Sequence, residues 1–319
     1  LITSGRYEIY NTGHPQEDYF NMYRIDDKSD LKEAVLYVDY KTNIREHNMA
    51  AAGREAGCGF SKSFVESFLC SDGLPISLSN KYLGDETMRK ETANRDPRLK
   101  QLILTNDFPT NVTDDLKDST FVVNEDEFIT QHCFTGYRPI KGFNPIYSQA
   151  LYMKSSFDGI AYRYAETLLI NAEAKAELNT ITDADLDRTI NQLRDRVGMP
   201  HLTVNVGFTD PKWPDWGYSL SPILQEIRRE RCIELAGEGF RFNDLKRWKA
   251  GNVLNNVLTY VGKRKPDGNL AIVYPNYTNP DLSYQAGKSR TWEDKMYLYP
   301  IPTGELQRNP QLLPQNPGW

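Results

Sequence analysis

The sequence lacks the features that mark several large classes of protein. No segment has the roughly eighteen consecutive apolar residues of a membrane-spanning helix. The first residues, LITSGRYEIYNTG, show no positively charged start, apolar stretch or cleavage site of a secretory leader. Basic runs do not exceed the three residues Lys263–Lys265, and both signs of charge are interspersed in a net charge of −5. These absences disfavour an integral membrane domain and a nucleic-acid-binding surface.

Cysteine and histidine are scarce, which leaves few residues for nucleophilic catalysis, metal binding or disulfide formation. The cysteines have no metal-ligand or redox spacing; a Cys58–Cys70 disulfide remains open, and the redox compartment stays undecided. The histidines lie in no recognisable nucleophile motif, and zinc-protease, EF-hand, P-loop and dinucleotide-binding patterns are missing. A glycosidase needs two facing carboxylates, but most acids here stand next to arginines that can pair with them. The sequence therefore predicts a protein that is not an enzyme and needs no cofactor or metal.

Hydrophobic residues and aromatic rings are plentiful. A chain of 319 residues with 39% hydrophobic residues can bury a large core, in one domain or in two that pack closely. Aromatic residues make up 12%, including 19 tyrosines. Two interpretations fit this excess: rings that anchor long loops, or rings that stack on sugars.

The stretch from Ser221 to Trp248 has the clearest pattern. Ser221 can cap a helix with its hydroxyl, and Pro222 suits the first helical position. A helical stripe follows and ends at Gly237, and a second short helix is expected over 243–250. The stripe consists of Ile223, Leu224, Ile227, Arg231 and Leu235.

Charged residues of this helix admit two interpretations. A row of Glu226, Glu230 and Glu234 among arginines is usually a solvated face with weak pairs. However, Arg231 lies on the apolar stripe, and large aromatics follow closely. We therefore expect paired, partly buried ions with an architectural role.

Two further helices are expected, at 160–178 and at 183–197, the second capped by Asp183. Together they resemble one tetratricopeptide-like unit, which must stack on a neighbour such as the Ser221–Leu235 helix. The loop that follows contains Trp213 and Trp216, and we interpret it as an apolar plug over helix ends.

The rest of the chain is irregular in sequence. Residues 1–30 and 79–96 are expected to be loops, Ala34–Tyr40 and Phe121–Val123 strands, and Ser61–Cys70 a short helix. Tyr297 to Ile301 alternates like a terminal strand, which its prolines confine to a sheet edge. We thus expect a loop-rich, ligand-facing part over 1–156 and a helical part with a terminal edge strand over 157–319.

Several long motifs resemble the SusD/RagB family of nutrient-binding proteins. They are EIRRERCIELAGEGFRFNDLKRW, FDGIAYRYAETLLINAEAKAELN and YLYPIPTGELQRNPQLLPQNPGW, with FVESFLCSDGLPI and RDPRL before them. The resemblance runs from about Leu31 to the end of the chain. It implies a mainly α fold, a tetratricopeptide-type scaffold with long irregular loops and a few short strands.

The same resemblance implies where the protein works. Family members begin with a signal peptide, a lipidated cysteine and helical repeats, so we expect this chain to be a C-terminal portion without those repeats. The full-length protein would be lipid-anchored at the extracellular face of the outer membrane, its only membrane contact. There it would capture an oligosaccharide and pass it to a SusC-like, TonB-dependent transporter.

The resemblance also points to ligand-binding loops, within 40–60 and 80–90. We expect rings from some residues there and hydrogen bonds from others, although each could be an ordinary exposed loop residue. Alternatives are capture of a peptide or other non-sugar nutrient, a secreted glycan-active enzyme, or a helical-repeat adaptor without a small ligand. The expected ligand-binding residues are Tyr40, Asn43, His47, Asn48, Arg54 and Tyr82.

Overall fold

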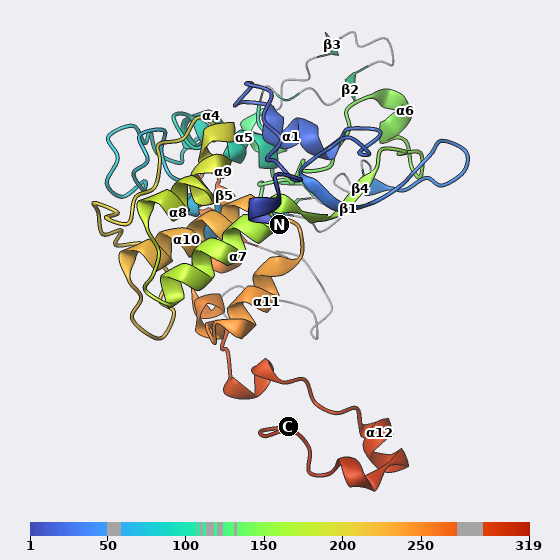
Figure 1. Ribbon diagram of the computed structural model, residues 1–319, viewed down its shortest axis with the longest axis vertical. Coiled ribbons are helices and arrows are strands. Elements are labelled where there is room, and N and C mark those ends of the chain that lie inside the picture. The colour runs from blue at the N-terminus through green and yellow to red at the C-terminus, as the bar shows by residue number, and fades with distance from the viewer. Residues whose placement is uncertain are drawn as a thin grey trace.

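The computed structural model describes residues 1–49, 59–106, 108, 111–112, 118–119, 124–130, 133–272 and 290–319. Regular structure in these ranges is mainly helical, with few and short strands, which confirms the expected fold class (Figure 1). The α-helices are α1 Asp18–Tyr23, α3 Lys62–Ser67, α4 Met88–Thr92, α5 Arg98–Leu102, α6 Tyr147–Ala150, α7 Tyr164–Glu177, α8 Asp183–Asp187, α9 Ile190–Arg196, α10 Pro222–Glu234, α11 Phe240–Arg247 and α12 Thr303–Arg308. The strands are β1 Ala34–Val38, β2 Asn111–Val112, β3 Asp118–Ser119, β4 Gly159–Arg163, β5 Val261–Arg264 and β6 Leu270–Ile272. Short 3₁₀-helices span η1 Ile2–Ser4, η2 Glu125–Glu127, η3 Gly251–Asn255, η4 Val257–Thr259, η5 Asp294–Tyr297 and η6 Pro310–Leu312.

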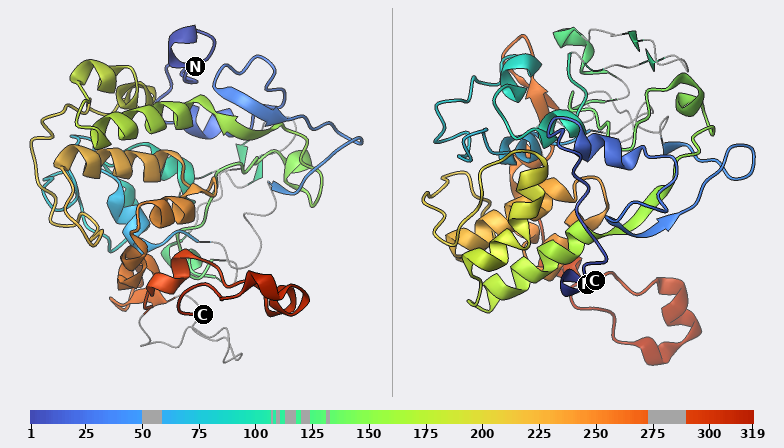
Figure 2. Two further views of the ribbon diagram at one scale, coloured as in Figure 1. Left: turned by 60° about the horizontal axis from the view of Figure 1, so that its bottom comes forward. Right: turned by 45° about the horizontal axis from the view of Figure 1, so that its top comes forward.

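Helices α7, α9 and α10 pack together and form one core (Figure 2). Leu168 and Leu169 of α7 are fully buried, as are Leu193 of α9 and Ile227 of α10. The apolar stripes that the sequence predicted meet in this core, and α10 is the neighbour on which α7 stacks. In the described part of the chain, no helix is both long and apolar enough to cross a membrane.

The helix expected over 183–197 is divided in two. Thr189 leaves helical geometry between α8 and α9, and its hydroxyl donates a hydrogen bond to the carbonyl of Asp185. A threonine hydroxyl that bonds to nearby backbone competes with a continuous helix. The cap was also misplaced, because Thr182 rather than Asp183 accepts the N–H of Asp185.

Helices α10 and α11 begin a little differently from expectation. Pro222 occupies the first turn of α10 as expected, but the side chain of Ser221 makes no capping hydrogen bond. Helix α11 starts at Phe240 and ends at Arg247, three residues earlier at each end than expected. Gly239 precedes it with φ of 85°, so the left-handed glycine begins the second helix directly.

The strand expected at Ala34–Tyr40 is present as β1 and pairs antiparallel with β4. Val38 stands opposite Gly159, and Ala34 stands opposite Arg163, directly before α7. This pair joins the first part of the chain to the start of the helical part. The strand expected at Phe121–Val123 lies outside the described residues.

The first part of the chain is more regular than its polar sequence suggested. Helix α1 lies within the expected loop 1–30, and Tyr19 and Met22 on it are fully buried. Helix α4 lies within the expected loop 79–96. Ser61 caps α3, which ends at Ser67, earlier than Cys70. A separate core forms here, with Phe68, Leu99, Leu102, Ile103 and Phe143 among its members.

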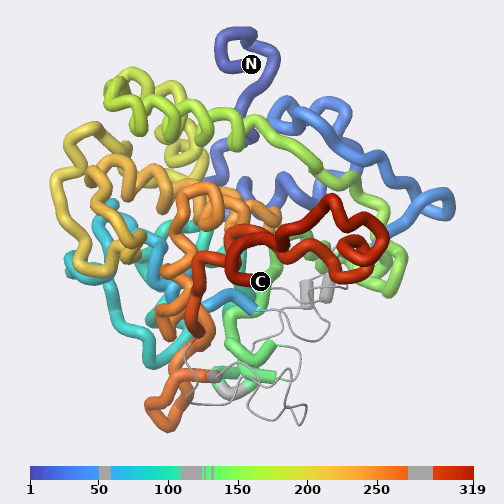
Figure 3. Tube along the Cα trace, turned by 90° about the horizontal axis from the view of Figure 1, so that it is seen from below, coloured from blue at the N-terminus to red at the C-terminus, as the bar shows by residue number. Residues whose placement is uncertain are grey.

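The prediction of an edge strand near the C-terminus is wrong. Within 297–301 only Tyr297 belongs to a regular element, the end of η5, and α12 begins later at Thr303. Pro300 and Pro302 offer no N–H for a strand ladder. No residue from Arg290 to Trp319 is buried, and this segment extends away from the body of the molecule in Figure 1 and lies in front of the body when seen from below (Figure 3). Trp292 holds its beginning, because its indole packs so closely on Gly251 that a Cβ there would overlap it.

Candidate functional site

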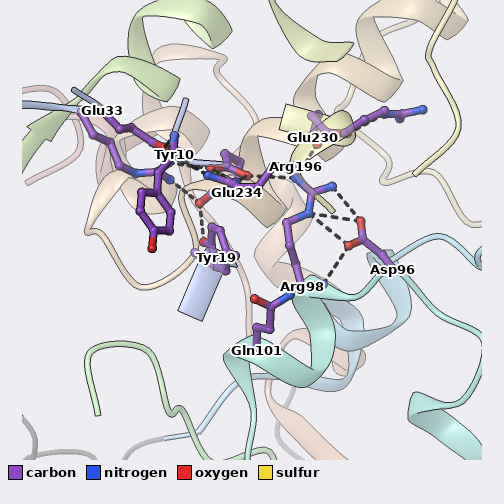
Figure 4. A network of polar contacts seen from close by, with 12 residues as sticks. Tyr10, Tyr19, Glu33, Asp96, Arg98, Gln101, Arg196, Glu230 and Glu234 are labelled. Carbon is purple, nitrogen blue, oxygen red and sulfur yellow. Dashed lines mark hydrogen bonds and ion pairs between the residues drawn. The ribbon is translucent and has the colours of Figure 1, made fainter. Parts of the chain in front are cut away.

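A buried ionic network lies at the C-terminal end of α10 and is centred on Glu234, the last residue of that helix (Figure 4). The carboxylate of Glu234 accepts hydrogen bonds from Arg98 at 3.0 Å and from Arg196 at 2.6 and 2.7 Å, and it also pairs with Arg163. Glu33 pairs with Arg163 at 2.9 Å and with Arg196 at 3.4 Å. All five side chains are at most 2% exposed. The network therefore ties together five segments that are far apart in the sequence.

Charge in this network is paired rather than available for a ligand, because Arg98 also pairs with Asp96 and Glu230, and Arg163 also pairs with Glu238. Burial alone would raise the pKa of Glu234, but Arg196, Arg163 and Arg98 hold that pKa well below its usual value. Glu226, Arg228, Glu230 and Arg231 of α10 are also buried. The solvated-face interpretation of this helix is therefore wrong, and the interpretation as paired, buried ions is confirmed.

Arg231, the charged residue on the apolar stripe, forms the buried ion pair that the sequence predicted. It is 4% exposed, and its Nε donates to Asp244 of α11 at 2.8 Å. Arg247 donates to the same carboxylate at 2.9 Å. These bonds fix how α10 and α11 join, which is an architectural role.

A groove of about 1140 Å³ opens on the other side of α10. It is lined by α3, the 210–216 loop, α10, α11 and the two 3₁₀-helices that follow α11. Trp216 in this loop is 2% exposed and meets the ring of Trp248 edge-on at 5.5 Å. The plug interpretation is thus confirmed for Trp216, whereas Trp213 is half-buried in the wall of the groove and donates to Glu226 at 2.7 Å.

The expected ligand residues Tyr40, Asn43, His47 and Asn48 lie together in one hairpin-like loop. Residues 40–49 pack against residues 147–156, and we call these two segments the loop surface. His47 and Ser155 exchange backbone hydrogen bonds at 2.9 and 3.1 Å. The side chain of Asn48 accepts the N–H of Met153 at 3.1 Å. The loop is therefore held in a defined shape.

His47 is the internal support of the loop surface. Its ring meets Tyr40 at 4.5 Å and Phe157 at 4.6 Å, both edge-on. Its Nδ1 accepts the N–H of Met49, which leaves Nε2 to donate to the carbonyl of Phe157 at 2.8 Å. Burial lowers the pKa of His47, so the ring is neutral at pH 7. Both nitrogens are occupied by backbone groups.

The open aromatic rings of the loop surface are ones that the sequence analysis missed. Tyr147, the first residue of α6, is 57% exposed, and Tyr152, two residues after the end of α6, is 71% exposed. Arg45 lies 4.9 Å from the ring centroid of Tyr40 and forms no ion pair with any described residue. Asn43 is exposed at the tip of the loop, with φ of 61°. The run YSQALYMK after a proline-punctuated loop was the available signal for these tyrosines.

The two remaining expected residues do not join this surface. Residues 79–90, which include Tyr82, lie at the opposite side of the molecule from residues 40–49 (Figures 1 and 2). Its ring is half-buried, with the guanidinium of Arg95 at 5.3 Å from the centroid, and burial raises its pKa. Arg54 lies outside the described residues. The structure thus brings together four of the six expected residues.

Cysteine and metal chemistry find no support in the described ranges. Cys70 is a free, buried thiol, so the Cys58–Cys70 disulfide is not formed. Burial raises the pKa of Cys70 and of Cys133, which makes both poor nucleophiles. Among the side chains that the structure places, no three or more His, Cys, Asp or Glu are grouped to hold a metal ion.

Comparison with known proteins identifies the chain. The sequence model of the SusD family matches residues 10–319, which is nearly the entire length. The chain belongs to the SusD family. SusD-like protein P2 of Formosa agariphila is 32% identical over 166 residues, 52% of this chain and 27% of that protein. The motif resemblance is therefore confirmed.

Solved structures of SusD-like proteins have the same fold. A SusD-like protein of Bacteroides fragilis is 25% identical, with a TM-score of 0.66 over 98% of this chain and 59% of its own. A SusD-like carbohydrate binding protein of the same species is 25% identical, with a TM-score of 0.60 over 89% of this chain and 55% of its own. This SusD-family chain thus spans little more than half the length of these structures. Membership of the SusD family agrees with the expectation that the chain is not an enzyme.

Proposed function

We propose that this SusD-family protein binds a glycan without cleaving it and that the loop surface is its binding site. The observation that carries the proposal is the pair of open rings, Tyr147 and Tyr152, on a rigid support. Sugars present apolar C–H faces, which gain by covering an exposed aromatic ring. A support of backbone hydrogen bonds between the two segments holds the rings without a cost of ordering on binding.

Polar groups at the same surface supply the directional contacts that a sugar needs. Asn43 carries an exposed amide, and Arg45 carries an exposed guanidinium without an ionic partner in the described chain. Both can donate hydrogen bonds to hydroxyl oxygens. Tyr40 and His47 are half-buried beneath them, so we assign these two residues a supporting role.

The wider setting is also part of the proposal. We infer that the full-length protein is a lipid-anchored protein at the extracellular face of the outer membrane. It would hold an oligosaccharide for a SusC-like, TonB-dependent transporter. The name of one similar structure, a SusD-like carbohydrate binding protein, supports the ligand class. Exposed Ile44, Leu151 and Met153 beside the tyrosines are apolar groups of the kind that a partner protein covers.

Calorimetric titration with a panel of neutral oligosaccharides tests the proposal. Covering about 60 Å² of each tyrosine ring contributes about 1.5 kcal/mol, so Tyr147→Ala and Tyr152→Ala should each weaken binding about tenfold. Tyr299→Ala is the matched control, because Tyr299 is 69% exposed and lies outside the loop surface. Its affinity should equal that of the unmodified protein.

Three outcomes would contradict different parts of the proposal. Unchanged affinity in both loop-surface variants would place the site elsewhere on the molecule. Binding of peptides, with no oligosaccharide bound at millimolar concentration, would favour peptide capture instead. Release of shortened sugars when the protein is incubated for a long time with an oligosaccharide would show that the protein is an enzyme.

A further inference from the structure

The groove beside α10 contains positive charge that its own acids do not neutralise. Asp210 pairs with Arg229 at 2.6 Å, Asp244 pairs with Arg231 at 2.8 Å, and Glu66 pairs with Lys212 at 3.0 Å. Most of the acids that line the groove are thus committed to a nearby base. The remaining bases are therefore not compensated by these acids.

Arg241 is the base without a partner. It lines the groove, is partly exposed, and forms no hydrogen bond or ion pair with any residue that the structure describes. Its guanidinium lies 5.8 Å from the ring of Trp216 and 5.9 Å from the ring of Trp248. Stacking on aromatic rings stabilises a guanidinium but leaves its charge in place.

Arg228 adds to the charge at the same place. Its guanidinium lies 5.0 Å from Trp216 and 4.4 Å from Trp248, so the same two indoles support both arginines. Arg228 is 3% exposed, and its carboxylate partner, Glu177 at 3.0 Å, has a side chain that is 48% exposed. Its Nε has no acceptor among the described groups, and neither does Nη1 of the 4% exposed Arg231.

These arginines create a positive field in a partly enclosed space. Attraction between charges is several-fold stronger there than in open water, because the surrounding protein is less polarisable. The buried arginines act through this field, while Arg241 is partly exposed as a residue and its buried Nη1 has no acceptor among the described groups. A planar guanidinium presents two parallel N–H groups, which match the two oxygens of a carboxylate or sulfate group.

Apolar walls accompany the charge. Phe60 and Phe64 lie in the lining, with ring centroids 4.5 Å apart, and half-buried Trp213 lies in the wall as well. A volume of about 1140 Å³ is sufficient for several sugar rings. The groove thus combines ring faces with one available cation.

We propose that this groove is a second binding site, for an acidic saccharide whose carboxylate or sulfate group binds to Arg241. The choice of a saccharide over an acidic peptide rests on the proposed function of the protein. Asp215 also lines the groove, is exposed, and forms no ion pair with a described residue. Its charge opposes an anionic ligand, so it limits affinity.

Titration with matched charged and neutral sugars tests this site. The probes are hexagalacturonate, its fully methyl-esterified and therefore neutral form, and a sulfated galactan hexasaccharide. All titrations use the double Tyr147→Ala/Tyr152→Ala background, in which two tenfold losses weaken the neutral binding expected at the loop surface about a hundredfold. The unmodified groove should bind one or both acidic probes and bind the neutral ester at least about tenfold more weakly.

Two substitutions should move the affinity for acidic probes in opposite directions. Arg241→Gln should weaken it about tenfold or more, because a charge-assisted pair is lost, and Asp215→Asn should strengthen it severalfold. Arg241→Lys keeps the charge but loses the fork, so its affinity should lie between those of Arg241→Gln and the unmodified groove. The control Arg6→Gln also removes one exposed positive charge, but outside the groove, and should change nothing.

Melting curves show whether each variant is folded. Arg241 has no hydrogen-bond or ionic partner to lose, only its contacts with Trp216 and Trp248, so Arg241→Gln should melt only slightly below the unmodified protein. If it unfolds, Arg241→Lys and Asp215→Asn decide the question. Equal binding of acid and ester, equal loss in Arg6→Gln, or preference for polyglutamate would overturn the proposal. The choice between uronate and sulfate probes identifies the anion. Loss of neutral binding in Tyr152→Ala is scored separately and bears only on the loop surface.

Discussion

Replacing Glu234 by glutamine is the sharpest test of the buried ionic network. The change keeps the shape of the side chain but removes the charge that faces Arg98, Arg163 and Arg196. The glutamine amide also turns an N–H group toward guanidinium donors, so one former acceptor is lost. Breaking a buried pair by removing one partner typically lowers the free energy of unfolding by about 3–5 kcal/mol.

The size of the chain converts this loss into a measurable shift in melting temperature. With an unfolding entropy of about 2.1 cal/mol/K per residue, a loss of 3–5 kcal/mol corresponds to a decrease of roughly 4–8 °C. The control is Glu305→Gln, which removes an exposed carboxylate that pairs with Arg308 at 3.0 Å. This substitution should lower the free energy of unfolding by less than about 1 kcal/mol. The assay is thermal and urea unfolding at pH 7, followed by circular dichroism.

The pH dependence provides an independent check on the same residue. Since the folded pKa of Glu234 is depressed, its stabilising contribution is complete above the usual carboxyl pKa near 4.5 and is lost as pH falls through the folded value. The variant and the unmodified protein should therefore converge in acid. If Glu234→Gln melts within about 1 kcal/mol of the unmodified protein at pH 7, the carboxylate does not organise the network.

Two further substitutions test neighbouring pairs. Arg231→Ala should lower the free energy of unfolding by more than about 1 kcal/mol, because it removes a buried partner of Asp244; an unchanged urea midpoint would contradict this. Burial alone would raise the pKa of Glu238, but Arg163 and Lys141 lower it to about 2. Glu238→Gln should therefore cost up to about 3 kcal/mol above pH 4.5, with the difference fading toward pH 2, and a constant difference across that range would refute the assignment.

The sequence predicted those parts of the fold that depend on helical periodicity. The stripes of α7 and α10 were found because apolar residues recur at regular spacing, and both helices are long enough to show it. Helix α1 was missed because six residues are too few for a periodic signal. The terminal strand was misjudged because alternation indicates a strand only where a partner strand exists, and Tyr297 belongs to a 3₁₀-helix instead.

The candidate sites depended on contacts that no local pattern contains. Tyr147 and Tyr152 matter because residues 147–156 pack against residues 40–49, more than 100 positions earlier in the chain. Tyr82 was grouped with Tyr40 because the family resemblance pointed to both of their loops, and the fold places the segments 40–49 and 79–90 at opposite sides of the molecule (Figure 1). Likewise, the unpaired state of Arg241 follows from where the acids of other segments point, which composition does not reveal.

The order in which the network's members occur along the chain bears on how the protein is made. Glu33, Arg98, Arg163 and Arg196 all precede Glu234, the carboxylate that joins three of those arginines. A ribosome delivers the chain from its N-terminus, so the arginines emerge before the one carboxylate that contacts all three. In a chain that ends before residue 234, Arg98 would keep Asp96 as a partner, and Arg163 and Arg196 would keep Glu33. Such a chain would lack only the carboxylate that joins the three arginines to one another, so the network becomes a single unit at the last residue of α10.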